Sequence, residues 1–176
     1  MLFKMASARH LSQARLRELL SYEPATGIFR WRVERRGSGY RRGEQPAGSI
    51  AGHLDVKGYS RIFIDGYRYK AHRLAWLYMM GVWPVGDIDH KNQNRADNSW
   101  ENLRVANRAQ NRINSAVSKN NSSGFRGAHT ARNGWTASIG HRGRRQHLGT
   151  FATPEDAQAA YVAAARKLYG EFAEAL

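Results

Sequence analysis

Residues 88–114 read IDHKNQNRADNSWENLRVANRAQNRIN, and the rest of the chain is interpreted outward from this stretch. Asp89 and His90 stand side by side after a short apolar approach, and Asn111 lies one turn into a predicted helix. A carboxylate and a side-chain amide oxygen suit Mg²⁺ or Mn²⁺, and an imidazole can deprotonate water. The stretch therefore predicts a one-metal site that hydrolyses phosphodiester bonds.

The geometry of this site depends on the strand that carries Asp89 and His90. Successive side chains of a regular strand point to opposite faces, so a local bend would be needed to bring both to the substrate. The alternative is an Asp-His pair within a network of turns that binds no metal. The neighbouring residues Asn92, Asn94 and Asn98 are predicted turn-formers.

Composition indicates the class of partner. The chain has 176 residues and a formal charge of +14, from 28 Lys and Arg against 14 Asp and Glu. Basic surface gains affinity for polyanions by releasing counterions from phosphates, so a nucleic acid is the expected partner. The absence of cysteine excludes disulfides, thiolate zinc sites and cysteine nucleophiles. No apolar run at the N-terminus is long enough for a signal peptide, so we expect a cytoplasmic protein without a membrane partner.

The first half of the chain predicts four elements: a helix over 11–22, a strand over 29–33, a hairpin over 58–69 and a helix over 72–80. Ser12 is the expected N-cap of the first helix, and Gly81 is expected to close the second. Asp65-Gly66 is a strong signal for the hairpin turn. His72, on the second predicted helix, is expected to be structural rather than catalytic.

Two segments predict loops. Residues 35–43, RRGSGYRRG, either lie along a phosphate backbone or form a solvated loop. Residues 115–124, SAVSKNNSSG, are polar, lack apolar periodicity and are typical of a linker. Beyond this linker we expect two or three short strands and a helix with Thr153 as N-cap and Pro154 at its first position.

Several short motifs of the central region carry a family resemblance: Ala71-His72-Arg73-Leu74-Ala75, Ile88-Asp89-His90, Asp97-Asn98, Asn102-Leu103-Arg104 and Gln110-Asn111. Residues 58–114 resemble the HNH endonucleases of the ββα-metal (His-Me finger) fold. They are most similar to the phage-type subgroup in which the last His is replaced by Asn.

This resemblance implies a role for each matched residue. His90 would be the general base, and Asp89 and Asn111 would bind the metal. Asn102 would complete the catalytic set by bracing the loop between the strands and orienting the His90 segment. Asn107 would cap the metal-bearing helix. An Asn at position 111 favours Mg²⁺ or Mn²⁺ over zinc or nickel.

A second resemblance covers residues 123–176. Its motifs are Gly124-Phe125-Arg126-Gly127, Gly134-Trp135-Thr136-Ala137-Ser138-Ile139, Leu148-Gly149-Thr150-Phe151 and Tyr169-Gly170-Glu171-Phe172-Ala173. They resemble a plant ethylene-response-factor (apetala) type DNA-binding domain, which implies a three-stranded sheet that packs on one helix and lies in the major groove. Gly140 and His147 depart from the family, which usually has Arg and Trp there.

The C-terminal region also supplies candidate DNA contacts. The resemblance implies that Arg126 and Arg145 contact DNA and that Trp135 either touches a sugar or packs. Independently of it, four arginines cluster on short strands and their turns: Arg132, Arg142, Arg144 and Arg145. Such a density predicts phosphate contacts, and the alternative is a solvated face.

Together these observations predict an α+β fold. An N-terminal β-rich region would lead into a ββα-metal nuclease core, followed by a small three-stranded sheet with one helix. The expected domains are an HNH nuclease over 1–116 with its core at 58–114, a linker over 117–124, and an ethylene-response-factor-type domain over 125–176.

The predicted function is a metal-dependent DNA endonuclease that uses Mg²⁺ or Mn²⁺ and no small-molecule cofactor. Its substrate would be double-stranded DNA, targeted by the C-terminal domain. The resemblance to phage homing-type enzymes implies a homing-like, nicking activity, encoded by a phage and exerted in the host cell. The first alternative is a non-catalytic, sequence-specific DNA-binding regulator. The second is an RNA-binding protein, which would share the charge but not the motif.

Overall fold

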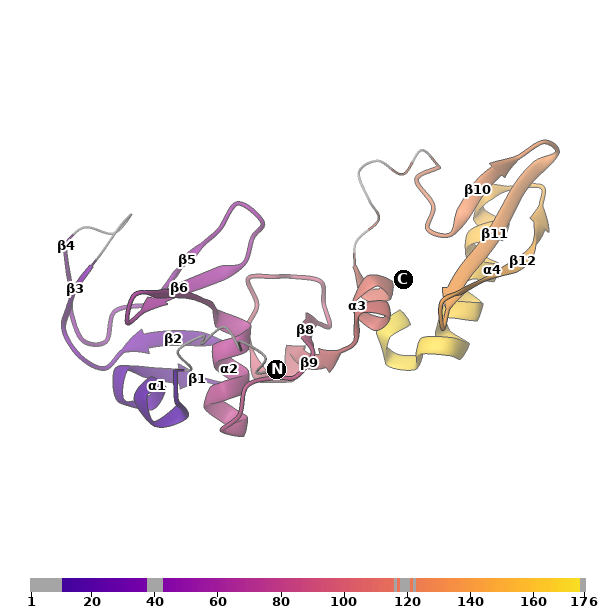
Figure 1. Cartoon of the computed structure of the whole chain (residues 1–176). Helices are drawn as coiled ribbons and strands as arrows, with labels where there is room; N and C mark the ends of the chain where they lie inside the picture. The colour runs from indigo at the N-terminus through magenta and orange to yellow at the C-terminus, as the bar shows by residue number, and fades with distance from the viewer. Residues whose placement is uncertain (1–10, 38–42, 116, 118–120, 122, 175–176) are drawn as a thin grey trace, which may run out of the picture. The chain divides into compact units, whose positions relative to one another are not determined.

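The computed structural model describes residues 11–37, 43–115, 117, 121 and 123–174. The chain forms two compact units (Figure 1). The first comprises Met1–His90 with Asn94–Arg104, and the second comprises Lys91–Gln93 with Val105–Leu176. Each unit has hydrophobic clusters of its own, and helices and antiparallel strands are mixed in both, which agrees with the predicted α+β class.

The first unit contains α1 (Gln13–Leu19), β1 (Leu20–Glu23), β2 (Ile28–Trp31), β3 (Arg35–Gly37), β4 (Gly43–Gln45), β5 (His53–Leu54), β6 (Ser60–Ile64), β7 (Tyr67–Lys70), α2 (Ala71–Met80), β8 (Asp87–His90) and η1 (Trp100–Asn102). The strand β9 (Leu103–Ala106) follows, and the division between the units falls within it. The strands pair as β1-β2, β3-β4, β5-β6-β7 and β8-β9. Most of the predicted Arg/Gly-rich loop, residues 38–42, lies outside the described residues.

The first predicted helix is shorter than expected. Ser12 does cap it, because its side chain accepts a hydrogen bond from the backbone N–H of Arg15. The helix ends at Leu19, and the next four residues form β1, in which Leu20 and Tyr22 are buried and their neighbours exposed. That alternation belongs to a strand, and pairing with β2 decides the conformation.

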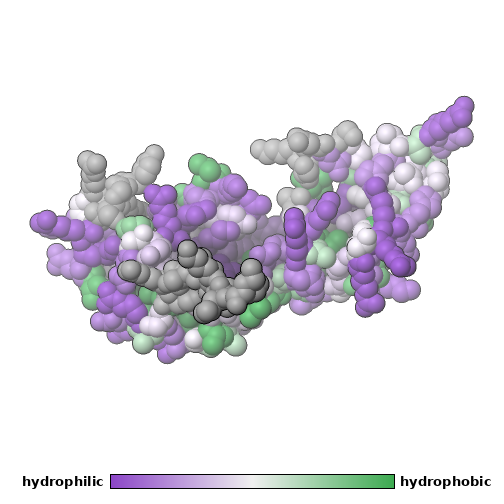
Figure 2. All heavy atoms as spheres, in the orientation of Figure 1, coloured by the Kyte–Doolittle hydropathy of each residue, from purple (hydrophilic) through white to green (hydrophobic). Residues whose placement is uncertain are grey.

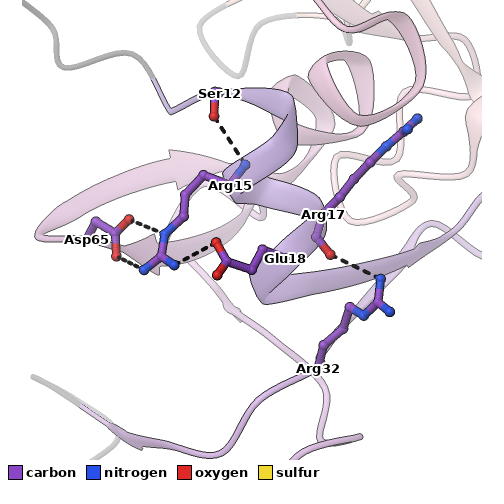
Figure 3. A network of polar contacts seen from close by, with 6 residues as sticks. All are labelled: Ser12, Arg15, Arg17, Glu18, Arg32 and Asp65. Carbon is purple, nitrogen blue, oxygen red and sulfur yellow. Dashed lines mark hydrogen bonds and ion pairs between the residues drawn. The ribbon is translucent and has the colours of Figure 1, made fainter.

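The predicted hairpin and second helix are confirmed. Asp65 and Gly66 both have positive φ angles, 47° and 87°, and connect β6 to β7. Positive φ at both central residues is the geometry of the tight hairpin turn that Asp-Gly favours. Gly81 ends α2 in the left-handed conformation. Arg15 of α1 binds the carboxylate of Asp65 and also pairs with Glu18, which ties α1 to the hairpin turn (Figure 3).

The turn after β1 lies against the loop that precedes η1. The hydroxyl of Tyr22 donates to the carbonyl of Asn98 at 2.7 Å, and the N–H of Trp100 donates to the carbonyl of Pro24 at 2.8 Å. Gly27 has a φ of 72°, and a Cβ built there would lie 2.2 Å from the carbonyl carbon of Asn98. Only glycine allows this approach, so the turn braces the loop that bears Asn98.

Replacing Gly27 by alanine is therefore expected to lower the free energy of unfolding by roughly 2 kcal/mol or more, from backbone strain and the collision with Asn98. Gly48→Ala is the matched control. Gly48 has a φ of 84° with nothing within 4 Å of a built Cβ, so its cost is strain alone. Urea denaturation measures both variants. Equal losses would show that the close approach has no energetic role.

The second unit contains α3 (Arg108–Asn114), β10 (Ala128–Ala131), β11 (Gly134–His141), β12 (Arg144–Phe151), α4 (Pro154–Tyr169) and η2 (Gly170–Ala173). The strands β10, β11 and β12 form an antiparallel sheet in that order (Figure 1). Ala128 and Ala137 of the sheet cluster with Ala157 of α4, and such small side chains allow close packing of the helix on one sheet face. Thr153 caps α4 as expected, accepting from the N–H of Asp156.

The helices leave no candidate for a membrane span. Within the described ranges, none is both long enough and apolar enough to cross a bilayer.

Candidate active site

The strand β8 carries Asp89 and His90, and both side chains are about 5% exposed. Asp89 contacts Arg104 of the neighbouring strand β9. His90 instead contacts His72 of α2. The two side chains therefore have different surroundings, as expected for neighbours that point to opposite faces of a strand.

Two aromatic rings lie close to the ring of His90. The His72 ring meets it edge-on, with centroids 4.9 Å apart and an interplanar angle of 86°. Tyr59 lies near both, 5.4 Å from His72 and 6.1 Å from His90. Two cations lie over the ring of Tyr59: Lys70 Nζ at 4.3 Å and Arg95 Cζ at 5.0 Å. The ring beside His90 thus carries two cations, which can attract an approaching phosphate.

Burial controls the protonation of both imidazoles. It lowers the pKa of His90, and this effect outweighs the opposing influence of a hydrogen bond with Asn98 and of the carboxylates of Asp89 and Asp97. Burial likewise lowers the pKa of His72 to about 3, and the charges of His90, Lys70 and Arg73 act in the same direction. Both rings are therefore neutral at neutral pH, and a general base must be neutral to accept a proton.

His72 should make the protein less stable in acid. In the unfolded chain its pKa is about 6.5, whereas in the folded chain it is about 3. The unfolded state therefore binds a proton first, and stability that is complete above pH 6.5 is lost as the pH falls toward 3.

From pH 7 to pH 5 the loss due to His72 should be about 2 kcal/mol, because each pH unit below 6.5 costs about 1.4 kcal/mol. His72→Gln is expected to remove that share of the pH dependence, measured by urea denaturation at both pH values. His53→Gln, at an exposed imidazole, is the control and should leave the pH dependence as it is. If the pH dependence of stability is also unchanged in His72→Gln, His72 is not held neutral in the folded protein.

The loop before β9 is folded by its own polar side chains. Asn94 accepts from the N–H of Ala96, and Asn98 donates to the carbonyl of Ala96. Asn102 donates to the carbonyl of Asp97 at 2.8 Å and is 8% exposed. Asn102 thus holds the loop from within, and its predicted effect on the His90 segment stays a prediction.

A buried ion pair lies beside the site. Arg104 Nε donates to Asp89 Oδ2 at 2.9 Å, and the two side chains are only 9% and 6% exposed. The pair holds Asp89 in one orientation and neutralises its charge. Sequence reasoning assigned no role to Arg104. A charged residue on a short, otherwise apolar strand was the signal that could have found it.

Asn111 belongs to the second unit. It lies on α3, whose N-cap Asn107 accepts from the N–H of Gln110 while the Gln110 side chain accepts from the N–H of Asn107. The backbone N–H of Asn111 bonds to the carbonyl of Asn107. This capping box defines where α3 begins. Because Asn111 and the Asp89-His90 pair lie in different units, their convergence on one metal stays a prediction.

The oxygen donors available fit Mg²⁺ or Mn²⁺ better than zinc. Within the described part of the chain, no group of three or more His, Cys, Asp or Glu side chains could hold a metal ion. A structural zinc site needs four such ligands. Mg²⁺ is commonly bound through one or two carboxylates, with water and substrate phosphate completing its shell. Asp89 and Asn111 each carry an oxygen donor of this kind, and their role as ligands of one ion stays a prediction.

The C-terminal sheet presents one polar face. Arg145 Nε of β12 donates to Ser138 Oγ of β11 at 2.8 Å, and Arg145 Nη2 lies 2.9 Å from His129 Nε2 of β10. One arginine thus reaches across all three strands. Arg132, Arg142 and Arg144 are exposed on the connecting turns and the start of β12.

Two of the predicted DNA contacts also make contacts within the protein. Trp135 packs against the alanine cluster beneath α4, on the opposite face of the sheet. Arg126 donates to the carbonyls of Arg112, Ile113 and Ser115, at the C-terminal end of α3. A guanidinium there satisfies carbonyls that lack helical partners. The position of Trp135 agrees with the packing alternative, whereas the contacts of Arg126 with the end of α3 were not predicted because they do not depend on local sequence.

Comparison with known families found a match for one part of the chain. Residues 69–113 match the model of a family described as HNH endonuclease. The HNH match includes every proposed site residue from His72 to Asn111, and it supports a nuclease. Searches of curated proteins and of solved structures found no match. No comparison supports the ethylene-response-factor resemblance of residues 123–176, which stays a prediction.

Proposed function

We propose that the protein is a metal-dependent DNA endonuclease of the HNH type. The observation that carries the proposal is His90. It is buried and neutral, it lies beside Tyr59, whose ring is covered by two cations, and it belongs to a segment that matches the HNH family. A neutral imidazole near the substrate is what the removal of a proton from water requires.

Each residue of the site has a proposed part in this reaction. The His90 imidazole takes the proton of the attacking water, while the edge of His72 holds the ring in place. Lys70 and Arg95 attract the phosphates that flank the scissile bond. Asp89 and Asn111 hold the divalent ion, Mg²⁺ or Mn²⁺. When bound, such an ion stabilises charge on the phosphoryl oxygens and on the departing 3′ oxygen.

The C-terminal unit would direct the enzyme to DNA. The face that carries Arg145, Ser138 and His129 offers hydrogen-bond donors across three strands, and a sheet face of this kind can enter the major groove. We propose that this module biases where cleavage occurs. The homing-like role of a phage-encoded enzyme in its host cell rests on the resemblance alone.

Cleavage of supercoiled plasmid tests the proposal. With Mg²⁺ or Mn²⁺ the protein should convert supercoiled DNA to the open circle, and EDTA should prevent this. One site per chain favours nicking, so linear product should appear only after the open circle. Plasmid that stays supercoiled with every divalent ion, while band shifts show that it is bound, would exclude the nuclease.

One observation favours a second candidate, a DNA-binding regulator without catalysis. The carboxylate of Asp89 is already paired with Arg104, and a guanidinium there competes with a metal ion. Metal-dependent cleavage separates the two candidates, because a regulator would bind duplex DNA equally well in EDTA and would never cut it.

A further inference from the structure

A hollow with a volume of about 830 Å³ lies within the second unit, and Arg145, Ser138 and His129 of the proposed DNA-binding face are among the residues that line it. Its walls come from α3, from Ser115, Val117 and Asn121, and from the end of the sheet where β11 turns into β12. Six arginines line it: Arg108, Arg112, Arg126, Arg142, Arg144 and Arg145. Cavities of this size commonly hold whole small-molecule ligands, so the hollow has room for a nucleotide rather than a single ion.

The positive charge in the hollow has no acidic counterpart. No carboxylate is among its lining residues, and residues 102–154 include neither Asp nor Glu. Packed cations that no carboxylate balances repel one another, and a bound anion relieves that repulsion.

The six arginines divide by what their guanidinium groups do. Arg126 is bound to the carbonyls at the end of α3, and Arg145 is bound to Ser138 and His129. The remaining four make no side-chain hydrogen bond or ion pair with any described residue: Arg108, Arg112, Arg142 and Arg144. Two of these are on α3 and two are at the β11–β12 turn, so free cations face the hollow from both sides.

We propose that this hollow holds the sugar-phosphate backbone of one strand of the DNA substrate, with Arg108 and Arg112 of α3 on one side and Arg142 and Arg144 on the other. The identity of the polyanion as DNA rests on the proposed function. One guanidinium group can bind two oxygens of the same phosphate, so several arginines suit a row of backbone phosphates. Figure 2 shows long hydrophilic side chains projecting from this unit.

The hollow gives α3 a second task. The same helix carries Asn111, the proposed metal ligand, and the neighbouring residue Arg112 lines the hollow. A strand held there would be positioned by the helix that holds the metal. DNA binding and metal placement would then be linked through one rigid element.

The test compares two double variants of the full chain that lose the same charge. Arg108→Gln/Arg112→Gln removes the α3 side of the hollow. Arg166→Gln/Lys167→Gln removes two exposed cations of α4, in the same unit but outside the hollow. Fluorescence anisotropy with a duplex oligonucleotide, in EDTA and over a series of salt concentrations, gives the affinity and its salt dependence.

The α3 variant should bind at least about tenfold more weakly at low salt, and the slope of log K against log salt should become shallower by about 2, one for each lost phosphate contact. The α4 variant should change the slope by much less. Arg142→Gln/Arg144→Gln, on the opposite side, should reproduce the α3 result. Because this variant leaves α3 unchanged, it still tests the inference if the α3 variant fails to fold.

Unchanged affinity and slope in both hollow variants would overturn the inference, as would an equal effect of the α4 variant. Tighter binding of single-stranded RNA than of duplex DNA by the wild type would also overturn it. Because binding is measured in EDTA, catalysis does not enter. A protein that binds through the hollow but never cuts DNA refutes the proposed nuclease alone.

Discussion

Replacing His90 by alanine is expected to slow DNA cleavage by about 10²–10⁴-fold, the usual contribution of a general base. The imidazole is buried and neutral, and its ring is held by the edge of His72. Alanine has no group that can take a proton from water. Single-turnover nicking of a supercoiled plasmid with Mg²⁺ measures the effect.

Binding distinguishes a chemical role for His90 from a structural one. His90→Ala should bind duplex DNA in EDTA as tightly as the wild type, because no DNA contact is attributed to the imidazole. Asn111→Ala should likewise lose cleavage and retain binding, since it removes a proposed metal ligand. If His90→Ala cuts at the wild-type rate, the base lies elsewhere, and if it loses binding in proportion to cleavage, His90 has a structural role.

The second large effect is expected at Arg104. Replacing it by methionine should lower the free energy of unfolding by about 3–5 kcal/mol, the usual cost of taking away one partner of a buried ion pair. The pair is only 9% and 6% exposed, so water cannot take the place of the guanidinium beside Asp89. Urea denaturation at pH 7 measures the loss.

A double-mutant cycle separates the ion pair from packing. Asp89→Asn/Arg104→Met removes both charges and should recover most of the stability that Arg104→Met loses, because no charge remains buried. Arg15→Met is the exposed control. Arg15 also pairs with carboxylates, but these side chains are 43% to 62% exposed, so little change is expected. A double variant as unstable as Arg104→Met would attribute the loss to packing.

Local rules account for the elements that were predicted well. The caps Ser12 and Thr153, the turn Asp65-Gly66 and the stop at Gly81 are all present as expected. Each depends on hydrogen bonds or φ angles within a few residues. A single sequence therefore contains all the information that such elements need.

The elements that were predicted poorly depend on partners far along the chain. Leu16, Leu19 and Leu20 would share one face if residues 11–22 formed a single helix. In the structure, Leu20 instead pairs with Trp31 in a sheet. Trp135 lies beneath α4 because the register of β11 turns it to that side. Pairing and register are set by contacts between distant segments, which periodicity does not reveal.

The candidate site likewise contains residues that the sequence predicts and residues that only the fold brings close. The residue types of Asp89 and His90 are those that phosphodiester hydrolysis needs, so the sequence predicts both, and the HNH resemblance adds Asn102. The partners that tune them, Tyr59 and Arg104, were not identified. Tyr59 precedes β6 and Arg104 lies on β9, and only folding brings them within contact distance.

By itself, the sequence determined the local turns and caps and predicted a polyanionic partner and the residues able to do the chemistry, because charge, functional groups and short-range hydrogen bonds are properties of neighbouring residues. Only the tertiary structure decided that His90 is buried and neutral, that Asp89 is paired with Arg104, and that arginines from α3 and the sheet face a common hollow. Burial and pairing depend on contacts between segments that are far apart in the sequence, and these contacts form only when the whole unit folds.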